Sequence, residues 1–444
     1  MVKTNKDGHR YRITFPGGEL IYYPLEGIIS DPERQRTFSL PEKRKFSLLS
    51  AGRSKQEFRS SYYKPVCLTI YPSHRCNLNC SYCYIPGKDN YCQEFIDPAV
   101  VEAGAEATVK NCKERSLPFI AGFHGGNEPL LHLSEIQNYL NICKSVADRN
   151  KIDFLPFCTT NGVIAESTAR WAAGNFYGIT LSWDGPAEIH DAFRKDRSGR
   201  PTSQSVERSA GIFSELKRNY GVFRVRCTVT SRSVERMEEI TGYFRNSGVK
   251  IVEFYPVFQN RDHTLLTEVI PDPVRFVYFF LKARSYGVEN GMDISFSGAR
   301  LSEYHNRFCM MLQDNLTLTP DGYITNCYYH THKYGRQNEL FFYGKYNSGE
   351  KRLELDQDKV NIIVRKYGED PAVCSACFNQ FHCSHGCPDL CPFNYQYSIA
   401  ARPDCLRERW LGLASVLEYS GYLNKFYSKS EFADFFQNIS SESI

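Results

Sequence analysis

The chain has 444 residues, of which 42% are hydrophobic and 23% charged, and its formal net charge is +4 at pH 7. This composition excludes a disordered, collagen-like or coiled-coil protein, and the length allows about three domains. The small charge argues against a nucleic-acid partner. No apolar run approaches the roughly 18 residues of a membrane span, and residues 1–7 lack the apolar core of a signal peptide, so we expect a cytoplasmic protein without a membrane partner.

Residues 1–64 are expected to form a small N-terminal extension. Two aromatic and β-branched runs, 11–15 and 19–23, flank the turn formers Pro16, Gly17 and Gly18, which is typical of a β-hairpin. Residues 31–64 carry nine Lys or Arg against four Asp or Glu, a local charge of +5. This basic segment is interpreted either as a solvated linker or as an arm that docks an acidic partner.

Residues 65–295 alternate short β-branched or aromatic runs with amphipathic stretches, as repeated βα units do. Strands are expected at 66–71, 119–123, 154–159, 178–182, 223–230 and 250–257, and helices at 98–114, 133–149, 165–173, 204–219, 234–246 and 273–286. Six units predict an α/β fold built on a partial (β/α)6 TIM-like barrel, open on one side. A doubly wound sheet has the same period and remains the alternative.

Two further segments follow the predicted barrel. From residue 296 to 405 the helical period fades and Cys, Tyr, Asn and Gly become frequent, which indicates a second domain. Residues 317–324 within it are typical of a β-hairpin whose turn needs Gly322. Residues 406–444 are expected to form a C-terminal helical tail of one or two amphipathic helices.

Seventeen cysteines in a cytoplasmic chain indicate metal sites rather than a disulfide scaffold. Six are dispersed singly and are expected to be small core residues: Cys67, Cys92, Cys112, Cys143, Cys158 and Cys227. The other eleven fall in three groups. The first group, Cys76, Cys80 and Cys83, directly follows the first predicted barrel strand, where barrels place their chemistry.

Three thiolates within eight residues can hold three irons of a cubane cluster and leave the fourth iron open. A closed zinc site completed by His74 is the alternative. The C-x3-C-x-aromatic-C spacing, with Tyr82 as the aromatic residue, resembles the radical S-adenosylmethionine (SAM) enzymes. The resemblance implies a [4Fe-4S] cluster on these cysteines that binds and reductively cleaves SAM.

Matching motifs follow the next strands. Gly125, Gly126, Asn127, Glu128 and Pro129 resemble the family's Gly-Gly-Glu-Pro motif with Asn127 as an additional residue. The resemblance implies that Gly125 and Gly126 bring the backbone close to SAM and that Glu128 receives its ammonium group. A glycine-rich turn before a helix is the structural alternative. Residues 160–162, Thr-Asn-Gly after strand three, also fit the family, and a simple turn explains them equally well.

The fourth strand leads into a segment that contains Ser182 and Arg194. The resemblance implies that these two side chains hold the ribose or carboxylate of SAM, and a guanidinium suits a carboxylate. A surface ion pair is the alternative for Arg194. For His190 and Asp191 we expect a structural role in a loop or at a helix start.

The other two cysteine groups lie in the predicted second domain. Cys309 and Cys327 form the second group, and the third is Cys374-x2-Cys377-x5-Cys383-x3-Cys387, followed by Cys391 and Cys405. Without Cys391, these seven residues resemble the SPASM extension of radical SAM enzymes, which carries two auxiliary iron-sulfur clusters, expected here as [4Fe-4S]. A zinc ribbon is the alternative, because C-x2-C pairs commonly bind zinc.

The resemblance to the extension also implies how the ligands divide. Cys374, Cys377, Cys383 and Cys405 would bind one auxiliary cluster, and Cys309, Cys327 and Cys387 the other. The fourth ligand of the latter is open between Cys391, His330, His332 and a substrate atom.

Enzymes with this extension mostly modify peptides or proteins. The resemblance therefore implies a maturase that uses a 5'-deoxyadenosyl radical to abstract hydrogen from a ribosomally made peptide and forms a cross-linked or oxidised residue. Implied partners are a precursor peptide or protein substrate and an electron donor such as flavodoxin or ferredoxin. Residues 1–64 would then either dock a leader peptide by strand addition or simply pack.

Three alternatives stay open. An anaerobic sulfatase maturase resembles the chain through residues 182–194, but such enzymes carry an Asp after the cysteine that matches Cys327, and here that residue is Tyr328. A SPASM-type small-molecule dehydrogenase is the second alternative. The third is a non-catalytic metal or redox protein, which would not need Glu128, Ser182 and Arg194 in a SAM site.

Overall fold

In the computed structural model, the chain is described in sixteen segments: 3–7, 10–15, 18–40, 63–83, 85, 95–125, 127–217, 220–257, 269–298, 301, 315–325, 327–328, 339–368, 374, 377–384 and 403–422. Strands within these segments form two sheets. One has five strands in the order β1 to β5, and the other has eleven. A buried hydrophobic cluster runs from the five-stranded sheet through the larger sheet to the last helix.

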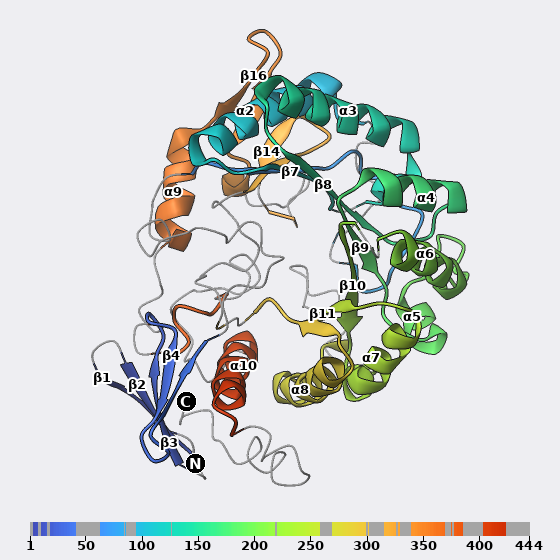
Figure 1. The fold of residues 1–444 in the computed structure, drawn as a ribbon. Helices are drawn as coiled ribbons and strands as arrows, with labels where there is room; N and C mark the ends of the chain where they lie inside the picture. The colour runs from blue at the N-terminus through green and yellow to red at the C-terminus, as the bar shows by residue number, and fades with distance from the viewer. Residues whose placement is uncertain are drawn as a thin grey trace.

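Seven parallel strands lie side by side in the larger sheet in the order of the chain. They are β6 (Cys67–Ile70), β7 (Phe119–Phe123), β8 (Phe154–Thr160), β9 (Gly178–Ser182), β10 (Val222–Val229), β11 (Ile251–Pro256) and β12 (Asp293–Ser295). A doubly wound sheet would reverse its strand order part-way, so this unbroken order excludes that alternative. The curved sheet in Figure 1 confirms the predicted partial TIM-like barrel.

Helices cover the convex face of the curved sheet (Figure 1). They are α2 (Pro98–Arg115), α3 (Leu133–Asn150), α4 (Glu166–Asn175), α5 (Ala187–Phe193), α6 (Ser203–Leu216), α7 (Met237–Asn246) and α8 (Pro273–Glu289). All but α5 coincide with predicted helices to within a few residues. The buried residues of β10 alternate with partly exposed ones, so every second side chain of this strand faces away from the helices.

The larger sheet continues past the barrel into the predicted second domain. Strand β13 (Asn315–Leu318) pairs in parallel with β6, and β14 (Tyr323–Thr325), β15 (Gly344–Asn347) and β16 (Arg352–Leu355) follow as antiparallel neighbours. The predicted hairpin is confirmed: Gly322 has a φ of +76° and donates its N–H to the carbonyl of Thr319 at 3.0 Å. Helix α9 (Gln357–Gly368), which the sequence pattern did not reveal, follows β16.

The five-stranded sheet is larger than the predicted hairpin. Its strands β1 (Lys3–Asp7), β2 (Arg10–Phe15), β3 (Gly18–Tyr23), β4 (Ile28–Asp31) and β5 (Arg36–Ser39) pair antiparallel throughout. The expectation of a linker or arm from residue 31 is wrong as far as residue 39. Strand β5 has mostly exposed side chains, and so its sequence gave no hydrophobic alternation to recognise.

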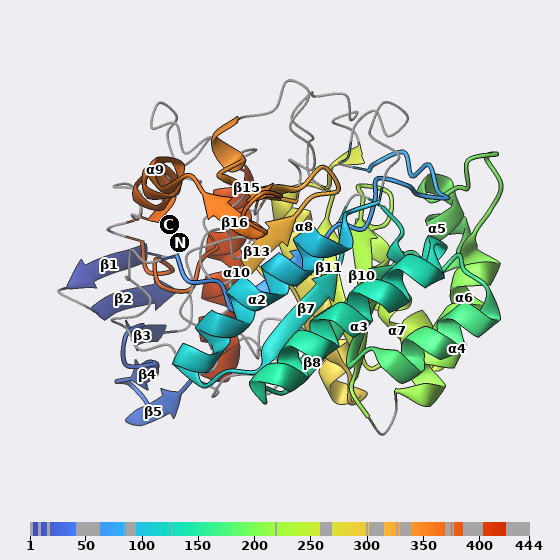
Figure 2. The same ribbon diagram turned by 90° about the horizontal axis from the view of Figure 1, so that it is seen from above.

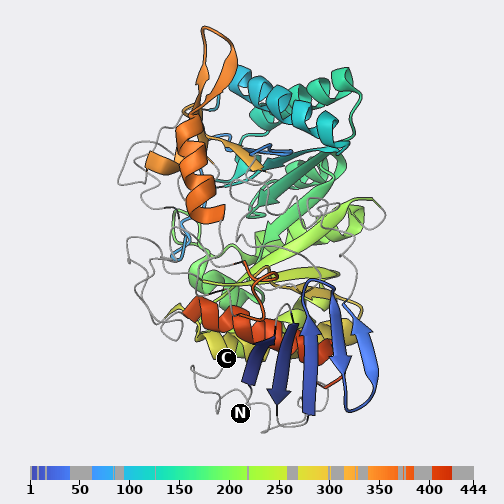
Figure 3. The same ribbon diagram turned by 90° about the vertical axis from the view of Figure 1, so that its left-hand side faces the viewer.

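This small sheet lies against the last helix, α10 (Pro403–Tyr419) (Figures 2 and 3). Just beyond α10, the Tyr422 hydroxyl donates to the fully buried carboxylate of Asp31 at 2.9 Å, and the Tyr422 ring contacts Phe15 edge-on. The extension is therefore packed onto the C-terminal part of the chain. No helix in the described residues is long and apolar enough to cross a membrane.

Removing the Tyr422 hydroxyl should loosen this contact. We expect Tyr422→Phe to lower the free energy of unfolding by about 1 to 3 kcal/mol, because the buried Asp31 carboxylate loses a hydrogen bond. Tyr23→Phe, at a partly exposed position of the same sheet, should change it by less than about 0.5 kcal/mol. Urea unfolding followed by circular dichroism measures both, and equal effects of the two substitutions would contradict the contact.

Candidate functional site

The loop after β6 carries the first cysteine group. Cys76, Cys80 and Cys83 are partly exposed thiols without disulfide partners. The N–H of Leu78 lies 3.5 Å from the sulfur of Cys76, and the side-chain amide of Asn161 lies 3.9 Å from it. The sulfur of Cys76 thus accepts from one donor in its own loop and from one that follows β8.

Backbone hydrogen bonds fix this loop to the segment after α5. The N–H of Asn79 donates to Lys195 at 2.9 Å, and that of Ser81 donates to Phe193 at 3.0 Å. Leu78 forms an isolated antiparallel bridge with Asp196. The cysteine loop and the residues around Arg194 are therefore one paired unit at the rim of the barrel.

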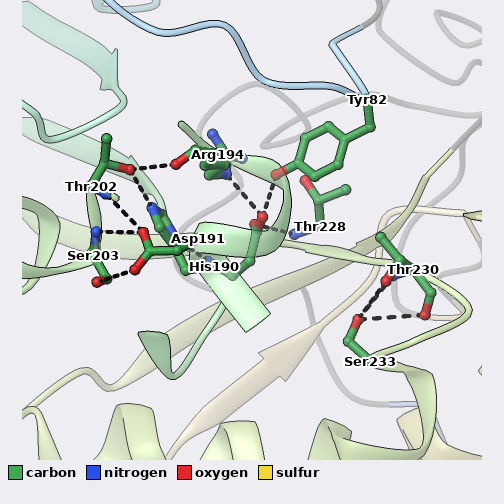
Figure 4. Close-up of polar contacts among 10 residues, drawn as sticks. Tyr82, His190, Asp191, Arg194, Thr202, Ser203, Thr228, Thr230 and Ser233 are labelled. Atoms are coloured by element: carbon green, nitrogen blue, oxygen red, sulfur yellow. Dashed lines mark hydrogen bonds and ion pairs between the residues drawn. The ribbon is translucent and has the colours of Figure 1, made fainter. Parts of the chain in front are cut away.

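A buried carboxylate, Asp184, connects this unit to the sheet. Its side chain accepts from the Tyr82 hydroxyl, from Nε of Arg194 at 2.9 Å and from the N–H of Thr228 at 2.9 Å (Figure 4). Tyr82 belongs to the cysteine loop and Thr228 to β10. No sequence motif assigns a role to Asp184. Only its position, two residues beyond the end of β9, could have indicated that it belongs to the site.

Arg194 is 8% exposed and lies 5.3 Å from the centre of the Tyr82 ring. Burial lowers the pKa of Arg194, but the neighbouring Asp184 carboxylate, Tyr82 and Cys80 raise it by more than burial lowers it. The pKa therefore lies well above the ordinary value. Arg194 is therefore a permanent cation. Because the ion pair with Asp184 uses Nε, the two terminal nitrogens remain available to an anionic ligand.

His190 and Asp191 form the expected structural network (Figure 4). Asp191 accepts from the backbone of Thr202 and Ser203 at 2.7 and 2.9 Å and so satisfies N–H groups at the start of α6. His190 Nδ1 accepts from the N–H of Asp184 at 3.3 Å. Burial lowers the pKa of His190 to about 4, which keeps its ring neutral at pH 7.

Glu128 is a second buried carboxylate at the rim, 1% exposed. It accepts from the Thr160 hydroxyl at 2.7 Å and from the backbone of Asn161 and Leu130 at 2.6 and 3.1 Å. Burial raises its pKa to about 7, although these hydrogen bonds oppose the rise. Residues 160–162 therefore do more than form a turn. Thr160 and Asn161 donate hydrogen bonds to Glu128, and the Asn161 side chain also contacts Cys76 of the cysteine loop.

Two further residues of the predicted SAM site, Gly125 after β7 and Ser182 at the end of β9, lie at the same rim. Gly125 has a φ of +101°, and a Cβ on it would come within 1.7 Å of the Tyr71 ring, so only glycine fits. Both polar atoms of the neighbouring Asn127 side chain are buried without a hydrogen-bond partner in the described structure. Ser182 ends β9 and is the register partner of Arg226. Gly126 lies outside the described residues.

Auxiliary-cluster cysteines gather near α10. Cys374, Cys377, Cys383 and Cys405, the cysteines predicted to bind one auxiliary cluster, are partly exposed and form no disulfide bond. The turn that carries Cys377 and Cys383 is tied to α10 by the Asn379 amide, which donates to the carbonyl of Glu408 at 3.0 Å. Arg409 of the same helix lowers the pKa of Cys377, although burial raises it on balance.

Cys327 is also predicted to bind an auxiliary cluster. It is buried and follows the end of β14 by two residues. Outside the described residues lie Cys309, Cys387, Cys391, His330 and His332, so the division of ligands between the two clusters stays a prediction. Within the described segments, no three His, Cys, Asp or Glu side chains are arranged to hold a metal ion. The donor chemistry nevertheless fits iron, because three partly exposed thiols that form no disulfide bond share one loop.

The dispersed cysteines behave as predicted. Five of the six, Cys67, Cys112, Cys143, Cys158 and Cys227, are buried, and burial raises their pKa. Such thiols are inert core residues. Cys92 lies outside the described residues.

Comparisons with known proteins identify similar sequences and similar folds. The chain is 28% identical over 192 residues to a cysteine-type anaerobic sulfatase-maturating enzyme of Clostridium perfringens, covering 43% of this chain and 51% of that protein. It is 23% identical over 202 residues to a serine-type enzyme of Bacteroides thetaiotaomicron, covering 45% and 48%. The chain thus matches about half the length of these relatives. No family model matches it.

Solved structures share the fold. Native anSMEcpe with bound AdoMet matches with a TM-score of 0.64 and 20% identity over 82% of this chain and 100% of that chain. Streptococcus suis SuiB bound to S-adenosylmethionine matches with a TM-score of 0.54 and 19% identity over 77% and 76%. The chain is thus similar in sequence to anaerobic sulfatase-maturating enzymes and in fold to anSMEcpe and SuiB.

Asp184 should be the most sensitive position of the site. We expect Asp184→Asn to lower the free energy of unfolding by about 3 kcal/mol or more, because Arg194 becomes a buried cation without its counter-charge. Glu166→Gln, which breaks the exposed ion pair with Arg170 on α4, should cost less than about 0.5 kcal/mol. Urea unfolding compares the two, and a small effect of Asp184→Asn would contradict the proposed role of its carboxylate.

Glu128 should make stability depend on pH in an unusual direction. Its folded pKa of about 7 exceeds the unfolded value, so the protonated form is favoured and the stabilising contribution is lost as pH rises through 7. Relative to Glu128→Gln, the wild type should lose about 2 to 3 kcal/mol between pH 5 and pH 8. Unfolding curves at both values test this, and parallel pH profiles would refute a raised pKa.

Proposed function

We propose that the chain is a radical SAM/SPASM maturase that abstracts hydrogen from a ribosomally made peptide and leaves a cross-linked or oxidised residue. The single observation that carries the proposal is the pairing of the cysteine loop with the segment around Arg194, which gathers three thiols, Glu128 and Arg194 at one rim of the barrel. Relatives that are radical SAM enzymes support the same reading.

The side chains at this rim match the charges of SAM. Glu128 presents a buried carboxylate whose pKa is raised by burial, and an ammonium group would give it a counter-charge. Arg194 and Ser182 would hold the carboxylate or ribose. When bound, the iron-sulfur cluster and SAM supply the electron and the 5'-deoxyadenosyl radical. The binding residues have no part in that electron transfer and act by position.

Positioning is the task of the chain itself. Asp184 fixes Arg194 and the Tyr82 ring relative to β10, so the cation and the cysteine loop keep a constant separation. Thr160 and the backbone of Asn161 orient the Glu128 carboxylate. Preorganised groups of this kind lower the cost of holding a reactive ligand next to one C–H bond.

The auxiliary cysteines would hold two further [4Fe-4S] clusters that relay electrons or bind substrate. Their proposed site beside α10 contains Arg409, whose charge acts on Cys377. A cation near a thiolate-bound cluster stabilises its reduced, more negative state. An external donor such as flavodoxin or ferredoxin would supply the electrons.

A peptide substrate is supported by structures that share the fold. Among them are anSMEcpe with a bound Kp18Cys peptide, with a TM-score of 0.63, and SuiB bound to the precursor peptide SuiA, with a TM-score of 0.51. For the five-stranded sheet, packing on α10 explains its buried face, while Arg10 and Arg12 on the opposite face of β2 are exposed. Leader docking would use that exposed face or an edge strand.

Sulfatase-type oxidation is the second candidate, because several of the relatives are sulfatase-maturating enzymes. The residue after Cys327 argues against this candidate, because it is Tyr328 where sulfatase maturases are expected to carry an Asp. Its ring lies 4.9 Å from that of His124, which follows β7, so this position does face the barrel rim. A cysteine-bearing sulfatase peptide incubated with the reduced protein separates the two candidates: formylglycine in the product would favour the second.

Iron content is the first test of the proposal. The anaerobically purified protein should contain about twelve irons, at four per cubane cluster, and the triple variant Cys76→Ala, Cys80→Ala and Cys83→Ala about eight. The matched variant Cys112→Ala with Cys143→Ala removes two buried core thiols and should keep all twelve. Zinc in place of iron, unchanged by the triple substitution, would refute the proposal and leave a zinc-binding protein.

Reductive cleavage of SAM separates an enzyme from a non-catalytic metal protein. With dithionite and SAM, the wild type should produce 5'-deoxyadenosine, and the triple cysteine variant should produce none. Liquid chromatography with mass detection measures the product. If the wild type with an intact first cluster forms no 5'-deoxyadenosine, the enzyme proposal fails.

A further inference from the structure

Two arginines on β10, Arg224 and Arg226, point to the same face of the larger sheet. Both are partly exposed and alternate with the buried residues Val225 and Cys227. Since helices cover the convex face, the two guanidinium groups lie on the concave face, inside the partial barrel (Figure 1). A charged group in a barrel interior is costly unless it is paired or meets a ligand.

Arg224 is neutralised by the protein. Its Nη1 lies 2.8 Å from Oε1 of Glu253 on β11. Glu253 is the register partner of Arg226, but its carboxylate pairs with Arg224. Among the described residues of this register on β10 and β11, two cations therefore share one carboxylate.

Arg226 stacks instead on an aromatic ring. Its guanidinium carbon lies 3.8 Å from the centre of the Tyr255 ring, and the Tyr255 hydroxyl contacts Ser297 at 2.6 Å. Within the described segments, Arg226 makes no ion pair. Stacking holds the guanidinium plane in place while leaving its N–H edge available, which is the arrangement suited to bidentate recognition of a carboxylate.

Arg226 is also next to the proposed SAM site. Ser182 is its partner on β9, and its carbonyl accepts from the N–H of Trp183 at 3.1 Å. Its charge reaches His124 at the end of β7, because burial and then the Arg226 charge lower the pKa of His124 to about 3. The imidazole of His124 is thus neutral and does not compete with Arg226 for an anion.

The geometry points to Arg226 as a specificity-determining residue that binds the side-chain carboxylate of an Asp or Glu in the substrate peptide. This inference rests on the proposed peptide-modifying function and adds a requirement to it: an acidic residue near the reacting position. An amide in place of the carboxylate would leave the guanidinium without a counter-charge inside the barrel.

An mRNA-displayed library of random decapeptides, linked through their C-termini, tests this. The reconstituted full chain is presented with the library under anaerobic conditions at saturating SAM. We expect the wild type to enrich Asp or Glu at one position by about tenfold or more over Asn and Gln. Arg226→Gln should lose this preference, and Arg226→Lys, which keeps the charge but not the planar fork, should keep part of it.

Arg208→Gln is the matched control, because it removes one positive charge from an exposed position of α6. It should enrich acidic residues as the wild type does. No acidic enrichment by the wild type, or the same enrichment by Arg226→Gln, would overturn the inference. So would a SAM affinity at least tenfold weaker in Arg226→Gln with the peptide preference unchanged, which would make Arg226 a SAM ligand.

The wild type's 5'-deoxyadenosine yield is measured in parallel. A wild type that cleaves SAM but shows no acidic preference refutes the role of Arg226 alone. A wild type that does not cleave SAM refutes the proposed function, whatever the library shows.

Discussion

The pairing of the Asp184 carboxylate with the Arg194 guanidinium is the constraint on which the rim of the barrel depends. The same carboxylate accepts from Tyr82 of the cysteine loop and from the backbone of β10, so three chain segments meet at one buried charge. A buried ion pair contributes little net stability but is costly to break. It therefore specifies one arrangement of the cysteine loop, whatever ligand the loop holds.

Continuity of the larger sheet joins the barrel to the segment with the auxiliary cysteines. Strand β13 pairs in parallel with β6, and β14 pairs antiparallel with β13. Cys327 after β14 and the cysteine loop after β6 therefore follow strands of the same sheet. The small N-terminal sheet lies on the other side of α10, and His382, next to Cys383, contacts the carbonyl of Pro24 at 3.2 Å. Residues far apart in sequence thus enclose the proposed cluster region together.

Strong local patterns made the barrel predictable. Its strands have β-branched runs, and its helices have apolar faces and caps such as Asp97 and Asp272. Strand β12 and helix α5 were missed because three and seven residues are too short for a period to show. Strand β5 was missed because its mostly exposed side chains show no hydrophobic alternation, and β4 was missed because four residues are too few for a period to show.

Sequence motifs suggest residues for the candidate site, but they do not reveal the contacts that connect them. Glu128 and Arg194 follow from motifs, whereas Asp184 acts through contacts with Tyr82, 102 positions earlier in the chain, and with Thr228, 44 positions later. Such contacts depend on the register of β9 and β10, which sequence spacing does not fix. The same holds for Arg226. Among the described residues it has no carboxylate partner, because Glu253 pairs with Arg224 instead.

Electron paramagnetic resonance of the dithionite-reduced protein, recorded with and without SAM, tests the central claim most directly. The account predicts that SAM changes the signal of a [4Fe-4S]⁺ cluster in the wild type and in a Cys374→Ala, Cys377→Ala variant. It also predicts no SAM-dependent change in the variant without Cys76, Cys80 and Cys83. A wild-type spectrum that SAM leaves unchanged would contradict the assignment of an open, SAM-binding iron to the loop after β6.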